Sequence, residues 1–567
     1  MPAVHLTLAD TVVLVGYLVM VVTIGLVAAR QIKSADHFFL GGRKFSKWVM
    51  IGQSFGTGTN ASMPVSLAGA VYTMGLSGIW YQWKNLFVTP FYWLLAPLFR
   101  RFRRTTMSEV FDDRYGRWMG AIYTVFALLF FTINLASMLK GAAKVIDQAL
   151  GGGLPVDLII IGMTCVFVLY SFTGGLLATA WTDLVQGFLI IALSFMLVPL
   201  GWHHVGGFDG MKATLGTEKF FLAAPEGIGV WTIVVLTING LVGIVAQPHL
   251  IASVGTGKDE NACRVGQFYG NMVKRVCTIG WALVGLMTAT LIARGVFGDT
   301  GLRDPEETFG YACRHLLFPG GLGLLIAALL AANMAGCSAF MVNSGAMITN
   351  GIYRKYLRPA ATDQRCLLIG RISGVLVVAC AVLYAVFLIQ RVLHTFLLTE
   401  TMATFVGISV IGGIVWPRAN RWGAVASIAA AMLANFTGYA LAGRRFDHWD
   451  PTIFLTALVV GVIALIVVSL LTPPEDPART AGFFNRLHTP SDSAADDTHA
   501  HTAPTAAARR AHAEAGRLLI LVNLLSLRRA AAGVPLLRAY RTDLKGFAVG
   551  VGLVGALIVA FLLLIRL

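Results

Sequence analysis

Long apolar runs, separated by short polar stretches, repeat along this chain. Each run holds about 20 residues, enough for an α-helix to cross the ~30 Å hydrocarbon core of a bilayer. The pattern predicts an all-α polytopic membrane protein with about fourteen transmembrane helices. The predicted spans are 8–29, 48–69, 77–99, 119–139, 156–172, 182–201, 229–249, 270–293, 320–349, 367–389, 395–416, 422–442, 452–472 and 546–566.

Two of these spans are interrupted by glycine, asparagine and proline. The interruptions cover 56–64 in the span 48–69 and 239–248 in the span 229–249. Irregular backbone is tolerated in lipid only where it lines a cavity or packs on protein. For either span taken alone, ordinary close packing of a glycine-rich helix is the alternative.

The two interrupted spans stand at matching positions. Spans two to six, at about 48–201, and spans seven to eleven, at about 229–416, form two sets of five, and each set opens with an interrupted span. Because five is odd, the second set is inverted relative to the first. Paired broken helices in an inverted repeat point to a transport site.

The composition excludes a soluble enzyme. Of the 567 residues, 56% are hydrophobic and 13% are charged, whereas soluble domains have roughly 25% charged residues. The chain has no Walker loop, HExxH motif or nucleophile elbow, so we predict no enzyme activity, no catalytic residues, no cofactor and no metal other than a coupling ion. Loop topology accounts for the net charge of +16, and no nucleic acid partner is expected.

Lysine and arginine are concentrated in short loops at 30–47, 100–117, 250–275 and 354–371. Positively charged short loops stay on the cytoplasmic side of a membrane. This bias predicts a multi-pass protein of the cytoplasmic, or inner, membrane with both termini outside.

The chain divides into a transporter domain at 1–472 with thirteen spans, an inner segment at 473–545 and a last span within 546–567. The inner segment opens with a polar, proline-containing stretch that is typical of a disordered linker, to about residue 508. From 509 to 541, arginine pairs alternate with leucine-rich patches. That pattern predicts an amphipathic helix, either on the anionic inner leaflet or against the transporter's own underside.

Three motifs carry a resemblance to a known family. GQSFGTGTNASMPVSLAGAVYTMGLSGIWYQW at 52–83, TGGLLATAWTDLVQG at 173–187 and AALLAANMAGCSAFMVNSGAMITNGIY at 327–353 resemble core helices of the sodium/solute symporter family. The resemblance extends over about 8–472. It implies a LeuT-type inverted repeat of five plus five helices, and a secondary active, cation-coupled symporter that imports a small polar solute by alternating access.

The resemblance also implies a sodium site, and here the sequence departs from the family. The backbone carbonyls of Gly56, Thr59 and Ala332 would be ligands, together with two side-chain hydroxyls at positions 335 and 336. Ala335 and Gly336 stand there, and neither has a side-chain oxygen. Either the sodium site is lost or another group compensates.

Asp183 is the candidate that compensates. Family members with a second sodium ion hold it near this aspartate and a hydroxyl at the position of Ser338, so the two residues could hold a cation, or Asp183 could carry a proton. The alternative is that Asp183 caps a helix N-terminus. Glu400 and Lys84 also lie within spans, and both are expected to reach the membrane surface.

The fold implied by the resemblance puts the solute between the interrupted spans. Aromatic side chains there can close over a small polar molecule or stack on a cation, although the tryptophans at 80 and 83 also fit an interfacial aromatic belt. In sugar-transporting members, glutamate replaces Gln82 and glutamine replaces Met63, which argues against sugar bound in that way. The candidate substrate-binding residues are Gln53, Phe55, Thr57, Asn60, Met63, Trp80, Gln82 and Asn239.

Two rival functions stay open. A transporter-like sensor would bind a solute without moving it and would signal through 473–545. An uncoupled uniporter of the same fold would follow directly from the missing sodium ligands. The expected partners are a small-molecule solute and the lipid bilayer, including anionic inner-leaflet lipids, and the coupling ion is Na⁺ or H⁺.

Overall fold

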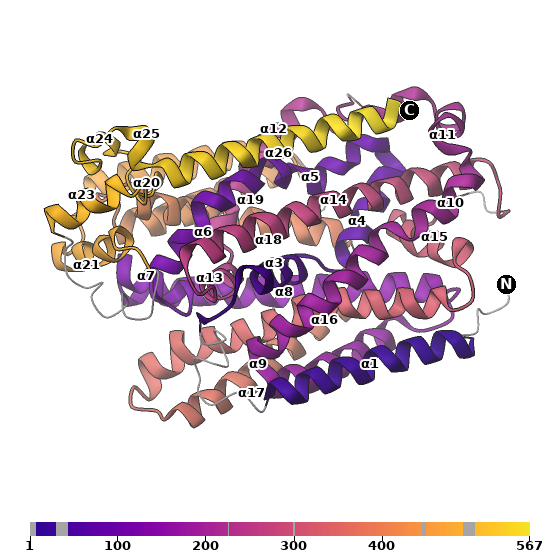
Figure 1. Cartoon of the computed structure of the whole chain (residues 1–567), viewed down its shortest axis with the longest axis horizontal. Coiled ribbons are helices and arrows are strands. Elements are labelled where there is room, and N and C mark those ends of the chain that lie inside the picture. Colours follow the sequence, from indigo (N-terminus) through magenta and orange to yellow (C-terminus); the bar gives the residue numbers. More distant parts are fainter. Residues whose placement is uncertain are drawn as a thin grey trace.

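The structure is a computed structural model that describes residues 7–29, 43–224, 226–298, 301–389, 391–443, 449–491 and 505–566. Within this part of the chain the secondary structure is helical, apart from one isolated bridge between Phe45 and Gly257. Long helices run roughly along the length of the molecule (Figure 1). The predicted all-α class is confirmed.

Most helices follow the predicted spans. These helices are α1 (Leu8–Ala29), α3 (Lys47–Gly58), α4 (Ser62–Met74), α5 (Trp80–Val88), α6 (Tyr92–Arg101), α8 (Arg117–Ala149), α9 (Val156–Phe195), α10 (Leu197–Val205), α12 (Val230–Gly243), α13 (Pro248–Gly255), α14 (Glu260–Ala293), α16 (Gly321–Ile348), α17 (Asp363–Phe387), α18 (Val392–Val415), α19 (Arg421–Leu441), α20 (Pro451–Leu471) and α26 (Arg541–Arg566). Shorter connecting helices are α7 (Met107–Tyr115), α11 (Gly207–Leu215) and α15 (Thr308–Leu316).

The predicted count of about fourteen spans is not confirmed. In the described part of the chain, 9 helices are long and apolar enough to cross a membrane, or up to 10 if the bent pair at Pro248 counts as one span. The loop predicted at 173–181 is helical, because α9 continues from the span expected at 156–172 into the one expected at 182–201. Segment 173–181 has no charge or proline, and a glycine in an apolar helix costs only about 1 kcal/mol.

The first predicted interruption is a break between α3 and α4. Helix α3 ends at Gly58, Thr59 is extended with φ −125° and ψ 127°, and α4 begins at Ser62. The break leaves backbone amides without helical partners. One of them, the Ala61 amide, donates to Asn333 Oδ1 of α16 at 3.2 Å, so a neighbouring helix satisfies the freed backbone.

The second predicted interruption lies between α12 and α13. The chain bends by 65° between Val230–Ala246 and Pro248–Gly255. Gln247 is extended with φ −67° and ψ 120°. Pro248 opens α13, where its missing N–H would have had no helical partner in any case. Both interruptions that the sequence predicted are therefore confirmed as breaks.

Glycines bring particular helices into backbone contact. A Cβ added at Gly270 of α14 would lie 2.8 Å from the carbonyl oxygen of Ile51 in α3, and one added at Gly374 of α17 would lie 2.7 Å from the carbonyl oxygen of Met341 in α16. Such positions admit only glycine. The helix pairs α3–α14 and α16–α17 are therefore packed more closely than larger side chains would allow.

The segment 473–545 differs from its prediction. Gly516 and Gly533 have φ values of +70° and +85° and interrupt the helix expected over 509–541, which the structure replaces by short helices and turns. Part of the predicted disordered linker, 492–504, lies outside the described residues, whereas 477–488 forms a helix and not a disordered stretch. The helices of this segment are α21 (Pro477–His488), α23 (Ala506–Glu514), α24 (Leu527–Ala530) and α25 (Leu536–Ala539).

These short helices gather at one end of the bundle, beside α7 (Figure 1). We call this end the α7 end. The start of α1 and the end of α26 lie at the opposite end (Figure 1). The two ends of the described chain are therefore on the same side of the molecule, away from the segment 473–545.

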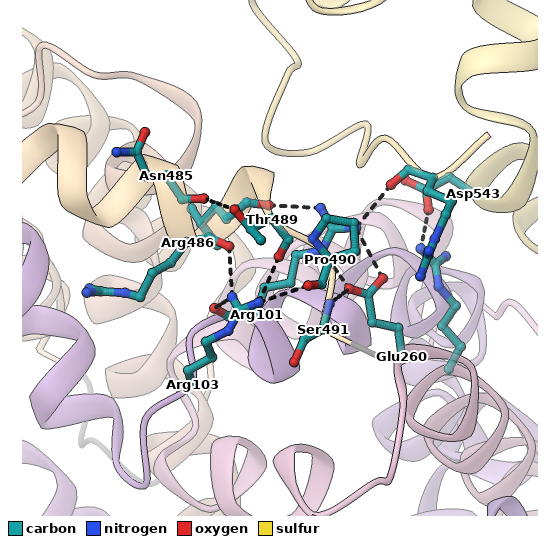
Figure 2. A network of polar contacts seen from close by, with 12 residues as sticks. Arg101, Arg103, Glu260, Asn485, Arg486, Thr489, Pro490, Ser491 and Asp543 are labelled. Atoms are coloured by element: carbon teal, nitrogen blue, oxygen red, sulfur yellow. Dashed lines mark hydrogen bonds and ion pairs between the residues drawn. The ribbon is translucent and has the colours of Figure 1, made fainter. Parts of the chain in front are cut away.

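A buried ion pair anchors this segment to the α7 end (Figure 2). The Arg101 guanidinium donates to both carboxylate oxygens of Glu260, at 2.8 and 3.1 Å. It also donates to the backbone carbonyls of Leu487 at 2.8 Å and Arg517 at 3.0 Å. Glu260 in turn accepts from the Ser491 amide at 2.8 Å. One arginine on α6 and one glutamate on α14 thus form hydrogen bonds to the backbone at three positions of the segment.

A second buried ion pair joins α14 to the start of α26. Arg264 and Asp543 lie 2.6 Å apart, and Asp543 also accepts from the Ile520 amide at 2.8 Å. Trp93 completes this contact, because its ring N–H donates to the Thr542 carbonyl at 3.0 Å and its own carbonyl accepts from Arg264 at 2.9 Å. We call Arg101, Glu260, Arg264 and Asp543 the anchoring cluster.

Candidate functional site

A partly enclosed cavity of about 90 Å³ lies where both broken helices are interrupted. It collects residues from the α3–α4 break, from the α12–α13 break and from α8, α14, α16 and α18. Polar and aromatic side chains are mixed on its wall. They include Thr57, Asn60, Met63, Phe130, Asn134, Gln247, His249, Asn271, Lys274, Arg275, Phe340, Phe396 and Glu400.

Three predicted substrate-binding residues lie on this wall: Thr57, Asn60 and Met63. All three come from the first break, where the irregular backbone brings successive side chains to the same side. The remaining predicted residues are buried but do not line the cavity, so their role in binding a solute stays a prediction. They are Gln53, Phe55, Trp80, Gln82 and Asn239.

Some of these residues contact other parts of the protein. Gln53 Oε1 accepts from Thr256 Oγ1 at 3.1 Å. Asn239 accepts from the hydroxyl of Thr404, on α18, at 2.5 Å. Phe55 faces α9, where a Cβ added at Gly187 would lie 3.3 Å from its ring. These side chains hold helices together beside the cavity.

The tryptophans at 80 and 83 are inside the protein. Their exposed fractions are 6% and 0%, so assigning them to an interfacial aromatic belt is wrong. Trp80 donates to the Leu222 carbonyl at 2.6 Å, and Trp83 donates to the Arg275 carbonyl at 3.2 Å. The Gln82 carbonyl accepts from the Arg275 guanidinium at 3.1 Å. Helix α5 is thereby fixed to α14.

Charged side chains also line the cavity. The sequence analysis assigned Glu400 to the membrane surface and did not consider the others. Glu400 and Lys84 form an ion pair and their exposed fractions are 8% and 0%, so the expectation that they reach the membrane surface is wrong. Lys274 and Arg275, which the sequence analysis missed, also line the cavity. Two adjacent cations inside the predicted span 270–293 could have marked these residues as candidates, since an ionisable residue in a membrane span is a functional candidate by default.

Asp183 is buried inside α9 and lies against the first broken helix. Thr57 Oγ1 donates to Asp183 Oδ2 at 3.2 Å. A Cβ added at Gly56 would lie 2.9 Å from the Cβ of Asp183, so α3 and α9 are in close contact here. Asp183 Oδ1 has no hydrogen-bond partner among the described residues. Because the residue lies in the middle of a helix, the N-cap alternative is wrong.

The other predicted ion ligands lie on α16 and at the first break. Ala332, Ala335 and Ser338 are buried. A Cβ added at Gly336 would lie 3.7 Å from the Thr57 carbonyl oxygen, so this position faces the first broken helix. Ser338 accepts a hydrogen bond from Ser171 Oγ at 2.7 Å, a contact that the sequence did not predict.

The Thr59 hydroxyl is buried and has no partner within the described ranges. The Gly56 carbonyl accepts from the Thr59 amide at 3.2 Å, inside the break. No group of three or more His, Cys, Asp or Glu side chains that could hold a metal ion occurs in the residues the structure describes. Any cation at this site would therefore depend on backbone carbonyls, hydroxyls and a single carboxylate.

Comparisons with known proteins agree with the fold. The model of the sodium:solute symporter family matches residues 38–430. The osmoregulated proline transporter OpuE of Bacillus subtilis is 27% identical over 495 residues, which cover 83% of this chain and 97% of OpuE. The sodium/proline symporter of Escherichia coli is 25% identical over 521 residues, covering 86% and 96% of the two chains.

A solved structure shares the fold. The substrate-bound, outward-open structure of a Na⁺-coupled sialic acid symporter superposes with a TM-score of 0.71 at 19% identity. The match covers 82% of this chain and 99% of that one. This chain therefore shares its fold with a solved transporter structure.

Proposed function

This chain belongs to the sodium:solute symporter family, and on that premise we propose that it imports a small polar solute through the central cavity, driven by a cation held at Asp183. Membership makes the chain a multi-pass membrane protein and a cation-coupled symporter. The proposal adds the place of the solute, the place of the cation and the connection between them.

One residue carries the proposal. Thr57 lines the cavity, and its hydroxyl donates to Asp183 at 3.2 Å. A change at the carboxylate, by ion binding or protonation, therefore reaches the cavity wall through one hydrogen bond. This is the direct physical link that coupling requires, because each ligand must favour the same conformation of the first broken helix.

The cation takes one of two forms at this site. A sodium ion would use Asp183 together with the carbonyls of Gly56, Thr59 and Ala332, which leaves it without the hydroxyls absent at Ala335 and Gly336. A proton would need only Asp183 Oδ1, the oxygen without a described partner. Ser338, already bonded to Ser171, would join the site only after a side-chain rearrangement.

The proposed orientation puts the α7 end and the segment 473–545 in the cytoplasm, with both termini outside the cytoplasmic membrane. The basic loops predicted as cytoplasmic support it. The start of α1 and the end of α26 lie on the same side of the molecule, which is consistent with this orientation (Figure 1).

The test is uptake by the full chain in proteoliposomes, with sodium and pH gradients imposed separately. The solutes are proline, because two relatives are named for it, and a panel of sugars, polyols, amides and carboxylates. We expect accumulation driven by one gradient. Asp183→Asn should reduce gradient-driven accumulation at least about tenfold, because it removes the charge that binds the cation. Exchange of solute across the membrane should continue.

The matched control is Asp157→Asn. Asp157 is on the same helix, its side chain is 54% exposed, and its carboxylate is 3.9 Å from Lys140, so wild-type accumulation is expected. Accumulation by Asp183→Asn at the wild-type level would move the cation elsewhere. Solute binding without flux under either gradient would favour the sensor, and flux independent of both gradients would favour the uniporter.

A further inference from the structure

The cavity wall carries a buried ammonium without a carboxylate partner. Lys274 of α14 has an exposed fraction of 7% and lines the cavity. Its Nζ donates to the carbonyl oxygen of Gly58, the last residue of α3. An ammonium has three donors. Within the described ranges, no aspartate or glutamate forms an ion pair with this lysine.

The neighbouring cation is also short of acceptors. Arg275 is 1% exposed and donates to the Gln82 carbonyl at 3.1 Å. Its Nε has no partner among the residues that the structure describes. Two consecutive cations of one helix thus face the same enclosed space, and backbone carbonyls are the only acceptors recorded for their side chains.

The carboxylate on the cavity wall already has a cationic partner. Glu400 is the single carboxylate among the described lining residues, and it forms the ion pair with Lys84. That pair is neutral as a whole. Glu400 also attracts Lys274 and Arg275, but one carboxylate faces three cations, so a net charge of +2 remains (three positive charges and one negative). A buried charge without a counter-ion costs several kcal/mol, so such groups normally have a partner.

We propose that the partner is the solute, and that the cavity selects solutes with a carboxylate, whose oxygens bind the Lys274 ammonium. The proposal rests on the proposed function, since it names the class of solute carried at that site. Phe130 and Phe340 belong to the apolar part of the wall, and the His249 ring packs against both, with ring centroids 6.1 and 4.9 Å away. Apolar walls with a few convergent polar groups are typical of small-molecule sites.

The experiment compares each carboxylate with its own amide. The probes are acetate, L-lactate, succinate and L-proline, set against acetamide, L-lactamide, succinamide and L-prolinamide. Binding to the detergent-solubilised full chain is followed by thermal unfolding, and uptake is followed in proteoliposomes. We expect at least one carboxylate to bind at least about tenfold more tightly than its amide, the preference that about 1.4 kcal/mol gives. Lactate against proline tells whether the carboxylate belongs to an anion or to a zwitterion.

Three variants make the test specific. Lys274→Met should remove the preference for the carboxylate, and Lys274→Arg should keep part of it. Lys258→Met is the matched control, because Lys258 is 59% exposed, and should keep the full preference. Without solute, Lys274→Met should unfold at the wild-type temperature or above, because it deletes an uncompensated charge.

The outcomes separate the two proposals. Equal binding of carboxylates and amides, no binding of any carboxylate, or a carboxylate preference that survives Lys274→Met would each overturn the carboxylate site. A preference that depends on Lys274, without uptake under either gradient, would leave the carboxylate site standing and overturn the transport proposal.

Discussion

The anchoring cluster and the charged residues at the cavity are both buried, and they differ in charge balance. In the anchoring cluster, Arg101 and Arg264 face Glu260 and Asp543, and each arginine is paired with an acid at 2.8 or 2.6 Å. At the cavity, Glu400 pairs with Lys84, and two more cations, Lys274 and Arg275, have no further carboxylate among the described lining residues. The two clusters are thus alike in burial and differ in charge balance.

The difference has a physical basis. A buried ion pair with its remaining donors satisfied fixes the position of the groups that it joins, and here it holds the segment 473–545 on α6 and α14. A buried cation without a counter-ion is costly in the empty protein. It becomes favourable only when a ligand brings the missing charge, so the same residue types serve attachment in one place and recognition in the other.

The largest expected effect tests the balanced cluster. Glu260→Gln leaves Arg101 buried without its acid and should lower the free energy of unfolding by about 3–5 kcal/mol. Thermal unfolding of the purified chain and protease access to 473–545 measure it. Glu514→Gln is the control, because that glutamate is 48% exposed and pairs with Arg510, and it should cost less than about 1 kcal/mol. Equal effects of the two variants would contradict the comparison.

The second effect tests the unbalanced cluster. Glu400→Gln removes the acid of the cavity and leaves Lys84 beside Lys274 and Arg275, so we expect a loss of about 2–3 kcal/mol, less than at Glu260 because the cavity admits water. Lys84→Met combined with Glu400→Gln should recover most of the loss. A carboxylate probe should stabilise Glu400→Gln more than wild type in the same thermal assay. A single variant as stable as wild type would show that the pair is not needed.

The smallest effect concerns pH at the anchoring cluster. Burial, with the nearby Arg101 and Arg509 charges, lowers the pKa of His488 from 6.5 to about 4. The unfolded chain therefore binds a proton at a higher pH than the folded chain, so the contribution is complete above pH 6.5 and is lost as the pH falls towards 4. With allowance for solvent screening, we expect docking of α21 to weaken by about 1–2 kcal/mol across that window. Hydrogen exchange of α21 measures this, and His488→Gln should remove the pH dependence; a variant that keeps it would assign the effect to another group.

The breaks could be predicted from sequence because their causes are local. Glycine and asparagine before Ser62, and proline at 248, weaken a helix locally, and the two breaks occur at these positions. Asp183 could be singled out from its sequence motif, and it lies beside Thr57 of the first broken helix; its role in ion binding stays a prediction. The prediction of a helix over 509–541 was wrong, because two glycines with positive φ interrupt the helix despite the amphipathic pattern.

The charge pairing could not be predicted from one sequence. Lys84 and Glu400 are 316 positions apart, and nothing local distinguishes a buried partner from a side chain that reaches the surface. The cavity wall had the same difficulty. Gln53 and Asn239 are polar and close to the breaks, but their directions depend on Thr256 and Thr404, which come from distant segments.

The glycine contacts described above have a mechanical consequence. Because Gly270 leaves no room between α3 and α14, and Gly374 leaves none between α16 and α17, neither pair can slide or roll internally without collision. Each helix pair should therefore move as one rigid unit, and relative motion should occur only where two such units meet. Thr57 and Asp183 face each other across the seam between α3 and α9. In the proposed function, a cation bound at Asp183 would hold α3 against α9, and its release would allow the two helices to move relative to each other.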